Sequence, residues 1–298
     1  MIVRAVRSFL AVAVAMCVAA GVLVSSVGAR PQGQQKVALV TVVADANGPI
    51  KDLTAKDFIV TEDNAKREVV DAQLADDPLS IALLIDTTQP AQGVTPPTLD
   101  LRTAVTTFVK TIQASSPQAK ISITETGGAA VTSVGFTSTF ADLEKGINKL
   151  VPNEPRSAVL LEGLTDASKR LGEQPAPRRA IVSIDFNSLE GSADKQLKPA
   201  VDAVHNAGAT LWAVSVRGNA AVSQAIREEA LNRMTQANGG MRFQPVDAPG
   251  LEPNLKIVAN SLNSQYTITF KRPDGGKPKV TKIETSRGAK VLLTPWMR

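Results

Sequence analysis

The sequence predicts an α/β protein with a doubly wound, mostly parallel sheet and a small β subdomain formed by strands from both ends of the chain. Between residues 79 and 262, short apolar runs such as IALLID and RAIVSID alternate with stretches of helical spacing. That alternation is typical of parallel strands joined by crossover helices. On both sides of this region, segments rich in β-branched residues alternate with turn residues, which favours β structure at each end.

Residues 1–29 have the pattern of a signal peptide. Arg4 and Arg7 precede the apolar run FLAVAVAMCVAAGVLV, and Val27 and Ala29 stand where cleavage requires small residues. We therefore expect a secreted protein, or one in the periplasm or cell envelope. The apolar run is close to the lower length limit of a membrane span, so an uncleaved membrane anchor is the alternative.

The composition excludes several classes of function. The chain has 298 residues, with 33 basic and 28 acidic side chains and only 4% aromatic residues. This mild, dispersed charge argues against a nucleic-acid partner, and membrane contact is expected only through the N-terminal segment if it is retained. The single cysteine, Cys17, lies in the leader, so the mature chain has no disulfide and no thiolate site. The single histidine, His205, excludes multi-histidine metal sites.

Residues 36–78 read as an N-terminal β segment. The run KVALVTVVAD is rich in β-branched residues, and DFIVTEDNAKREVVDAQL reads as two strands around a turn at Asp63–Asn64. Between them, DLTAKDF predicts one helical turn. Residues 263–298 return to β pattern, with SQYTITFKR, the turn PDGGKP and KVTKIETS. We expect this C-terminal hairpin region to pack with the N-terminal β segment, because a lone hairpin is not stable.

Residues 79–262 form the predicted α/β core. IALLID, RAIVSID and TLWAVSV are apolar without clean alternation, as expected for strands buried on both faces. Helices are predicted where apolar residues recur every three or four positions, and Pro199 starts or kinks one of them. The best defined series are Leu101–Val105–Phe108–Ile112, Leu160–Leu164–Ala167–Leu171 and Leu251–Leu255–Val258–Leu262.

Two of the apolar strands end in aspartate. IALLID ends at Asp86 and RAIVSID ends at Asp185. Parallel strands bring their carboxyl ends to one edge of the sheet, where ligands bind in open α/β folds, so both carboxylates should meet there. The alternative is that each aspartate only caps the helix that follows it.

The sequence resembles the von Willebrand factor A (VWA) domain, in particular the bacterial VWFA-related proteins. VTVVADANGPIKDLTAKDFIVTEDNAKREVV follows the β segment that precedes the A domain in that family. Further on, MTQANGGMRF resembles the family's T-G-G-x-x-F/Y turn and LNSQYTITF its L-x-x-Q-Y-x-L-x-Y strand. The matching residues of the first segment are Asp45, Gly48, Leu53, Asp57, Phe58, Glu62 and Asp63. The resemblance implies a Rossmann-like VWA core.

The resemblance also implies a metal-ion-dependent adhesion site (MIDAS). In that site a D-x-S-x-S motif, a loop threonine and a later aspartate hold Mg²⁺ or Ca²⁺, which prefer oxygen ligands. One coordination position stays open for a carboxylate of the partner. By residue-to-residue match, Asp86 is the first aspartate, Thr88 keeps the first hydroxyl and Asp185 is the later aspartate.

Two ligand positions of the implied site have lost their oxygen. Pro90 stands at the second serine, and Ala158 stands at the loop threonine, with Ser157 one residue away. The site therefore reads as degenerate, and no resident cofactor is expected. The alternative is weak binding of Mg²⁺ or another divalent cation by Asp86, Thr88, Ser157 and Asp185. The binding rim around these positions is expected to include Thr87, Gln89, Phe186 and Asn187.

The function expected from these features is a non-catalytic, adhesion-type module that binds a protein partner. A hydrolase on a doubly wound sheet is the alternative from another class. The sequence has no phosphate-binding G-x-x-x-x-G-K-[ST] loop, no G-x-G-x-x-G turn and no G-x-S-x-G elbow. His205 would have to serve any serine triad, and the sequence indicates no partner for it. A structural role at the cell envelope is the third hypothesis.

Overall fold

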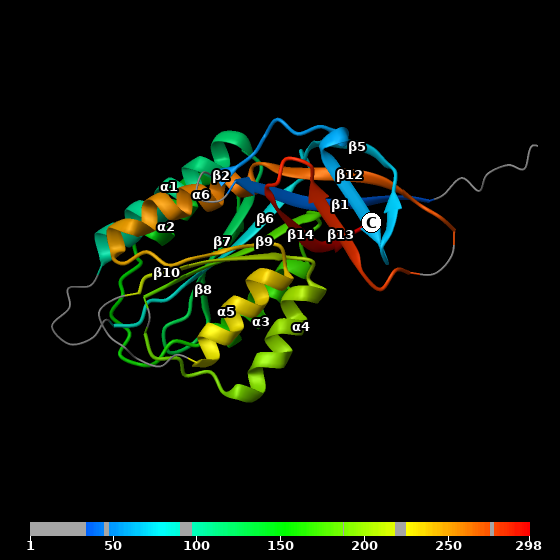
Figure 1. Ribbon diagram of the computed structural model, residues 1–298. Helices are drawn as coiled ribbons and strands as arrows, with labels where there is room; N and C mark the ends of the chain where they lie inside the picture. The colour runs from blue at the N-terminus through cyan, green and yellow to red at the C-terminus, as the bar shows by residue number, and fades with distance from the viewer. Residues whose placement is uncertain (1–33, 45–47, 90–96, 187, 218–224, 275–276) are drawn as a thin grey trace, which may run out of the picture. The chain divides into compact units, whose positions relative to one another are not determined.

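The computed structural model describes residues 34–44, 48–89, 97–186, 188–217, 225–274 and 277–298. Its largest sheet has six strands in the order β11–β10–β9–β6–β7–β8 (Figure 1). All neighbouring pairs are parallel except β7 and β8. The predicted mostly parallel α/β core is thus confirmed. The strands are β6 (Leu79–Ile85), β7 (Lys120–Glu125), β8 (Val131–Thr137), β9 (Arg178–Asp185), β10 (Thr210–Ser215) and β11 (Arg242–Phe243).

Helices cover both faces of this sheet. Helices α1, α2 and α6 bury their apolar residues with one face, and α3, α4 and α5 with the other (Figure 1). Strand β6 shows why the sequence gives this arrangement. Its alternate residues Ile81 and Leu83 join the first cluster, whereas Ala82 and Leu84 join the second, so every position must be apolar. The helices are α1 (Thr98–Ser115), α2 (Phe140–Ile147), α3 (Leu160–Gly172), α4 (Leu197–Asn206), α5 (Ala225–Ala237) and α6 (Leu251–Leu262).

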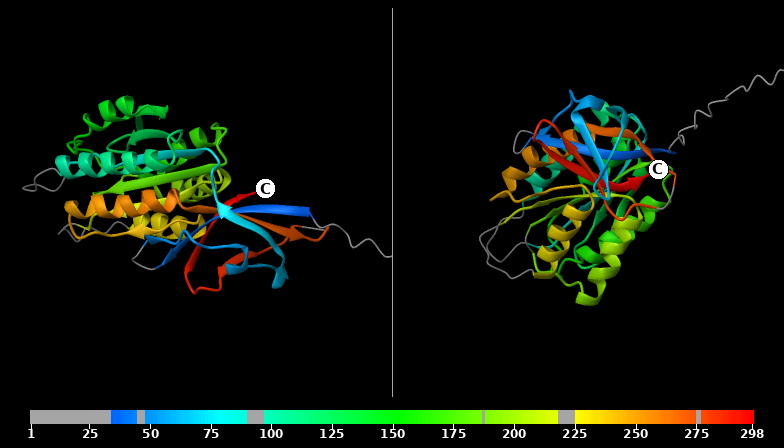
Figure 2. Two further views of the ribbon diagram at one scale, coloured as in Figure 1. Left: turned by 90° about the horizontal axis from the view of Figure 1, so that it is seen from above. Right: turned by 45° about the vertical axis from the view of Figure 1, so that its right-hand side comes forward.

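Strands from the two ends of the chain share two further sheets, which confirms the predicted β subdomain (Figure 2). One has the order β14–β1–β12–β5, with β2 also paired to β1, and the other has the order β13–β3–β4. Their apolar residues form a separate core cluster that includes Val40, Phe58 and Tyr266. The strands are β1 (Gln34–Ala44), β2 (Gly48–Pro49), β3 (Phe58–Glu62), β4 (Ala65–Arg67), β5 (Val69–Leu74), β12 (Gln265–Arg272), β13 (Thr281–Thr285) and β14 (Lys290–Met297).

The C-terminal strands do not form the expected hairpin. Strand β12 pairs with β1 on one edge and with β5 on the other, so both of its edges are occupied. Strand β13 pairs instead with β3. The pairing of β12 with β1 runs from Gln34–Arg272 to Thr41–Gln265, and this long register outcompetes the local turn. The predicted turn at Asp63–Asn64 is present between β3 and β4, with positive φ at both residues.

Arg178, the first residue of β9, ties the sheet to the chain segments that lead into the β subdomain. Its buried guanidinium donates to the carbonyl oxygens of Ala75 and Asp77, each at 3.1 Å, and to that of Leu262. It also donates to the side-chain oxygen of Gln265 at 3.1 Å. These acceptors lie just before β6 and at the junction of α6 with β12. The chain passes between the β subdomain and the core twice, from β5 to β6 and from α6 to β12, and Arg178 bonds both connecting segments.

The predicted signal peptide, residues 1–29, lies outside the described residues. Within the part of the chain that the structure describes, no helix combines the length and the apolar character needed to cross a membrane.

Candidate functional site at the carboxyl edge of the sheet

Asp86 and Asp185 lie side by side at the carboxyl edge of the parallel sheet. Asp86 follows β6 directly, and Asp185 is the last residue of β9, the neighbouring parallel strand. The backbone N–H of Asp86 donates to the carbonyl oxygen of Ile184 at 2.9 Å, which sets the two ends level. Both residues are buried, with 2% and 3% of their surface exposed. The structure thus brings the two predicted carboxylates together.

Asp86 does not cap the next helix, so that interpretation was wrong. Strand β6 ends at Ile85 and helix α1 begins at Thr98, so Asp86 is too far from the helix to cap it. The Oδ1 atom of Asp86 instead accepts the backbone N–H of Thr88 at 2.9 Å and also the Thr88 hydroxyl. Its Oδ2 atom accepts the hydroxyl of Ser188, from the loop after β9. Asp86 therefore organises the rim of the sheet rather than a helix end.

Ser157, the predicted hydroxyl ligand, lies in the loop before α3 and contacts the loop after β7. Its carbonyl oxygen accepts the N–H of Gly128 at 2.9 Å. Among the hydrogen bonds of the described residues, none joins the Ser157 hydroxyl to Asp86 or Asp185. Ala158 is pinned in the same loop, because its N–H donates to Leu189 and its carbonyl accepts Gly191. The serine hydroxyl that donates to Asp86 is that of Ser188, in the loop after β9.

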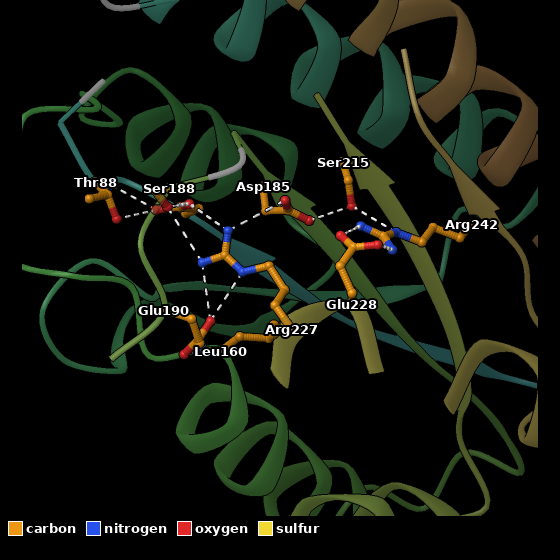
Figure 3. A network of polar contacts seen from close by, with 10 residues as sticks. Thr88, Leu160, Asp185, Ser188, Glu190, Ser215, Arg227, Glu228 and Arg242 are labelled. Carbon is orange, nitrogen blue, oxygen red and sulfur yellow. Dashed lines mark hydrogen bonds and ion pairs between the residues drawn. The ribbon is translucent and has the colours of Figure 1, made fainter. Parts of the chain in front are cut away.

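A buried arginine, Arg227 of α5, points its guanidinium toward Asp185 (Figure 3) and also lies beside Asp86. Its Nη1 atom lies 3.8 Å from Asp86 Oδ2 and 3.6 Å from Asp185 Oδ1. The arginine side chain is 1% exposed. Its positive charge is therefore held at the centre of the rim, out of contact with solvent.

Glu190 holds this guanidinium in position. The Nε and Nη2 atoms of Arg227 both lie 3.1 Å from Glu190 Oε2. The other carboxylate oxygen, Oε1, accepts the backbone N–H groups of Leu160 at 3.0 Å and Ser192 at 3.1 Å. Glu190 thus also satisfies a free N–H at the start of α3, where a negative charge is favourable. Arg227 is therefore fixed by a residue that is itself anchored.

A second ion pair fastens α5 beside Arg227. Ser215, at the end of β10, donates its hydroxyl to Asp185 Oδ2 at 2.6 Å and accepts from Arg242 Nε at 3.1 Å. The two Nη atoms of Arg242 each bond Glu228, the next residue of α5, at 2.6 Å. The polar network therefore runs from β6 through β9 and β10 to β11 and closes on α5 (Figure 3).

Burial and the neighbouring charges have opposite effects on the pKa of Asp185, and also on the pKa of Arg227. Burial raises the pKa of Asp185, although the charge of Arg227 and the hydrogen bond from Ser215 lower it. Burial lowers the pKa of Arg227, but the charges of Asp185, Asp86 and Glu190 outweigh it and raise the pKa overall. The guanidinium therefore stays protonated at any physiological pH.

Known structures share this architecture, although no protein-family model and no curated protein sequence matches the chain. A von Willebrand factor type A protein from Catenulispora acidiphila matches with a TM-score of 0.53 and 10% identity, over 90% of this chain and 74% of that one. The α/β core has the von Willebrand factor A fold. Because the identity is so low, this likeness concerns the fold alone.

Two further structures match the VWA core less completely. Proximal thread matrix protein 1 from the mussel byssus, with a zinc-occupied MIDAS motif, matches with a TM-score of 0.51 and 13% identity, over 71% of this chain and 50% of that one. The PilB minor pilin from Streptococcus sanguinis matches with a TM-score of 0.51 and 10% identity, over 64% and 62%. This chain thus spans about half and less than two thirds of these two proteins.

The residues at this VWA rim do not fit the metal ion that the family resemblance implies. Within the described residues, no group of three or more histidine, cysteine, aspartate or glutamate side chains is arranged to hold a metal ion. A divalent cation between Asp86 and Asp185 would lie against the guanidinium of Arg227, and like charges at such a distance repel strongly. The two carboxylates already have a cation beside them.

The residues expected to line the binding rim of the VWA core differ in accessibility. Gln89 is exposed, but Thr87 is buried. Phe186 is half-buried and packs against the core cluster on the α1 face. Asn187 lies outside the described residues, as does Pro90. Of the four predicted rim residues, Gln89 is the one that the described structure offers fully to a partner.

Sequence reasoning missed the residues that complete the VWA rim, namely Ser188, Glu190, Ser215, Arg227 and Arg242. Arg227 sits in AIREEALNRM, where an arginine looks like an ordinary solvated helix residue. One signal could have found it. Two lost metal ligands beside two retained aspartates leave buried negative charge, and such charge needs a cation from elsewhere in the chain.

Proposed function

We propose that this VWA module is an exported, non-catalytic protein-binding domain whose rim binds its partner without a divalent cation. The observation that carries the proposal is the guanidinium of Arg227, 3.8 Å from Asp86 and 3.6 Å from Asp185. A MIDAS metal would offer an open position to a partner's carboxylate. The buried guanidinium offers none, so recognition falls to the exposed side chains around it.

Exposed apolar side chains at the same edge support a protein partner. Leu99, Val131, Leu189 and Val246 are each more than half exposed. Leu189 follows β9 and Val246 follows β11, while Leu99 lies in the first turn of α1. Val131 pairs with Glu125, the last residue of β7. Exposed apolar side chains on several elements of one edge support a protein-binding surface there.

The position of His205 supports a non-catalytic role. It lies in the last turn of α4, which leads into the start of β10. The start of a parallel strand is at the amino edge of the sheet, whereas Asp86 and Asp185 lie at the carboxyl edge. The single histidine therefore cannot act with either carboxylate as a general base. Among the described residues, no constellation of groups favours the hydrolase alternative.

Export rests on the signal-peptide pattern of residues 1–29. Edman sequencing of the protein recovered from the envelope and the medium tests it. A new N-terminus at Arg30 is the expected result, and an intact Met1 would indicate a retained anchor.

The binding proposal is tested by capture of partners from an envelope extract of the source organism. The immobilised protein is compared with Leu189→Asp, at the rim, and with Val280→Asp, an exposed apolar residue before β13. We expect one partner to bind equally in EDTA and in Mg²⁺. Leu189→Asp should weaken binding about tenfold or more, and Val280→Asp should leave it unchanged.

Two results would contradict this proposal. Loss of the partner in EDTA would favour the alternative, weakly metal-dependent binding through Asp86, Thr88 and Asp185. Equal binding by the Leu189→Asp variant and the wild type would show that the partner uses a surface other than this rim.

A further inference from the structure

Arg227 has an unusual hydrogen-bond inventory for a fully buried arginine. Its Nε and Nη2 atoms bond Glu190, and Nη2 also lies 3.5 Å from the Ser188 hydroxyl. Its Nη1 atom is buried and has no hydrogen-bond partner among the described residues. That atom faces Asp86 and Asp185 across 3.8 and 3.6 Å. It therefore contributes its charge to the two carboxylates rather than a directed hydrogen bond.

We infer that Arg227 is a built-in cation that replaces a metal ion at the rim, and that its removal uncovers a latent divalent-cation site. This inference rests on the proposed metal-independent function and explains it. Asp86 and Asp185 would supply the charged oxygens of the uncovered site, and Thr88 and Ser188 would supply hydroxyls. Both hydroxyls already bond Asp86 in the present structure.

The chemistry of the donor set favours this interpretation. Carboxylate and hydroxyl oxygens are the ligands that Mg²⁺ and Mn²⁺ take in proteins. Glu190 is committed elsewhere, because its Oε1 atom accepts two backbone N–H groups at the start of α3. Without Arg227, two buried carboxylates would face each other uncompensated, and such a pair must gain a cation or a proton.

A built-in cation also fixes the shape of the rim. Arg227 and Glu228 are adjacent in α5, and each forms an ion pair with a different element. Glu190 anchors the first to the loop after β9, and Arg242 anchors the second to β11. Helix α5 is thus held against the sheet whether or not metal ions are present. The module is then constitutively competent to bind rather than dependent on cation supply.

The test measures Mn²⁺ binding and thermal unfolding of the full-length protein and of Arg227→Ala. The wild type is expected to bind no Mn²⁺ by electron paramagnetic resonance and to keep its Tm when Mn²⁺ is added. Arg227→Ala should unfold about 10 °C lower in EDTA, because it leaves uncompensated buried charges. Saturating Mn²⁺ should restore about 5 °C and bind stoichiometrically. Adding Asp86→Asn to the variant should abolish both effects.

Two further variants keep the test decisive. Arg227→Gln is neutral and retains more of the side-chain volume, so it replaces Arg227→Ala if that protein does not fold. Arg178→Ala is the matched control, because it also removes a buried arginine, but one bonded to carbonyl and amide oxygens. It should lose stability and gain no response to Mn²⁺.

The inference is wrong if neither Arg227 variant binds Mn²⁺ more tightly than the wild type. It is also wrong if the wild type binds Mn²⁺ stoichiometrically with Arg227 in place. These results do not depend on any partner. Loss of the partner from the wild type in EDTA would contradict the proposed function, whereas variants that do not respond to Mn²⁺ would contradict the inference alone.

Discussion

Two buried arginines lie at opposite edges of the α/β sheet, and strand β9 connects their surroundings. Arg178 is the first residue of β9, and Asp185, which faces Arg227, is the last. Arg178 donates to neutral oxygens of the backbone and of Gln265. Arg227 lies among the carboxylates of Asp86, Asp185 and Glu190. Arginine thus has two roles in this sheet. Arg178 links chain segments at the amino edge, and Arg227 neutralises carboxylates at the carboxyl edge.

The pKa values of the two guanidinium groups reflect these partners. Burial lowers the pKa of Arg178 to about 10, although the charges of Asp77 and Asp76 raise it. Burial also lowers the pKa of Arg227, but three carboxylates outweigh it and raise the pKa overall. Burial of an arginine therefore does not by itself indicate a functional site. The charge of its partners distinguishes a site from a structural tie.

The largest effect in this comparison is expected from Arg178→Ala. The change removes the guanidinium that donates to the carbonyl oxygens of Ala75, Asp77 and Leu262, which should cost about 4 kcal/mol of unfolding free energy. Urea unfolding measures this loss, which should be the same in EDTA and in Mn²⁺. Arg179→Ala, at the half-buried neighbouring position, is the control and should cost less. Equal losses would show that Arg178 is not a special tie.

Asp86→Asn and Asp185→Asn, at the carboxyl edge, are expected to lower the free energy of unfolding by smaller and unequal amounts. Asp86→Asn replaces an oxygen that accepts hydrogen bonds from Thr88 or Ser188 by a donor, and should cost about 3 kcal/mol. Asp185→Asn should cost less, because burial raises the pKa of Asp185 and makes its ionised form less favourable. Urea unfolding at pH 7 measures both, and the reverse order would contradict the assignment of Asp86 as the organising residue.

The pH dependence of Asp185→Asn sharpens this prediction. A carboxyl group with a raised pKa in the folded state holds its proton to a higher pH than it does in the unfolded chain. Its contribution to stability is therefore complete below the unfolded pKa and is lost as the pH rises through the folded pKa. The variant should gain stability relative to the wild type as the pH rises above about 4, the pKa of aspartate in an unfolded chain. A difference that stays constant as the pH rises would contradict the raised pKa.

Glu62 of β3, in the β subdomain, has a lowered pKa, whereas Asp185 has a raised one. We expect Glu62→Gln to lower the free energy of unfolding by about 2 kcal/mol at pH 7. Burial raises the pKa of its carboxyl group, but hydrogen bonds and charges from Arg272 and Arg67 outweigh burial and lower the pKa. Its stabilisation is therefore present above pH 4.5 and is lost as the pH falls through the folded pKa. Acid titration of stability should show the Glu62→Gln difference shrinking below pH 4.5, opposite in sign to that of Asp185→Asn.

The sequence predicted the buried strands of the α/β sheet, but it did not predict the exposed edge strand β8 or the pairing of the C-terminal strands. Strands β6, β9 and β10 were predicted because all or nearly all of their residues are buried, which demands unbroken apolar runs. Strand β8 was missed, because it is an edge strand whose residues are exposed or half-buried and carry no apolar run. The pairing of β12 and β13 was predicted wrongly, since local turn chemistry does not reveal competing partners more than 200 residues away.

The candidate site was predictable only where it depends on strand topology. Asp86 and Asp185 could be placed together because parallel strands end at one edge. Arg227 could not, because its contacts reach residues 37 to 141 positions earlier in the chain. The orientation of helix α5 over the sheet decides those contacts, and local periodicity does not specify it. The same limit applies to Arg178, whose acceptors lie 84 to 103 residues away.

The smallest effect is expected from His205→Ala, which tests the hydrolase alternative away from both arginines. His205 is exposed in the last turn of α4, where a histidine side chain contributes about 0.5 kcal/mol or less to stability. Both proteins should show no turnover of p-nitrophenyl acetate or p-nitrophenyl phosphate. Turnover by the wild type that disappears in His205→Ala would require the histidine to reach a substrate at the amino edge of the sheet. The chemistry would then lie at the amino edge of the sheet, and the carboxyl edge around Arg227 would no longer be the functional centre.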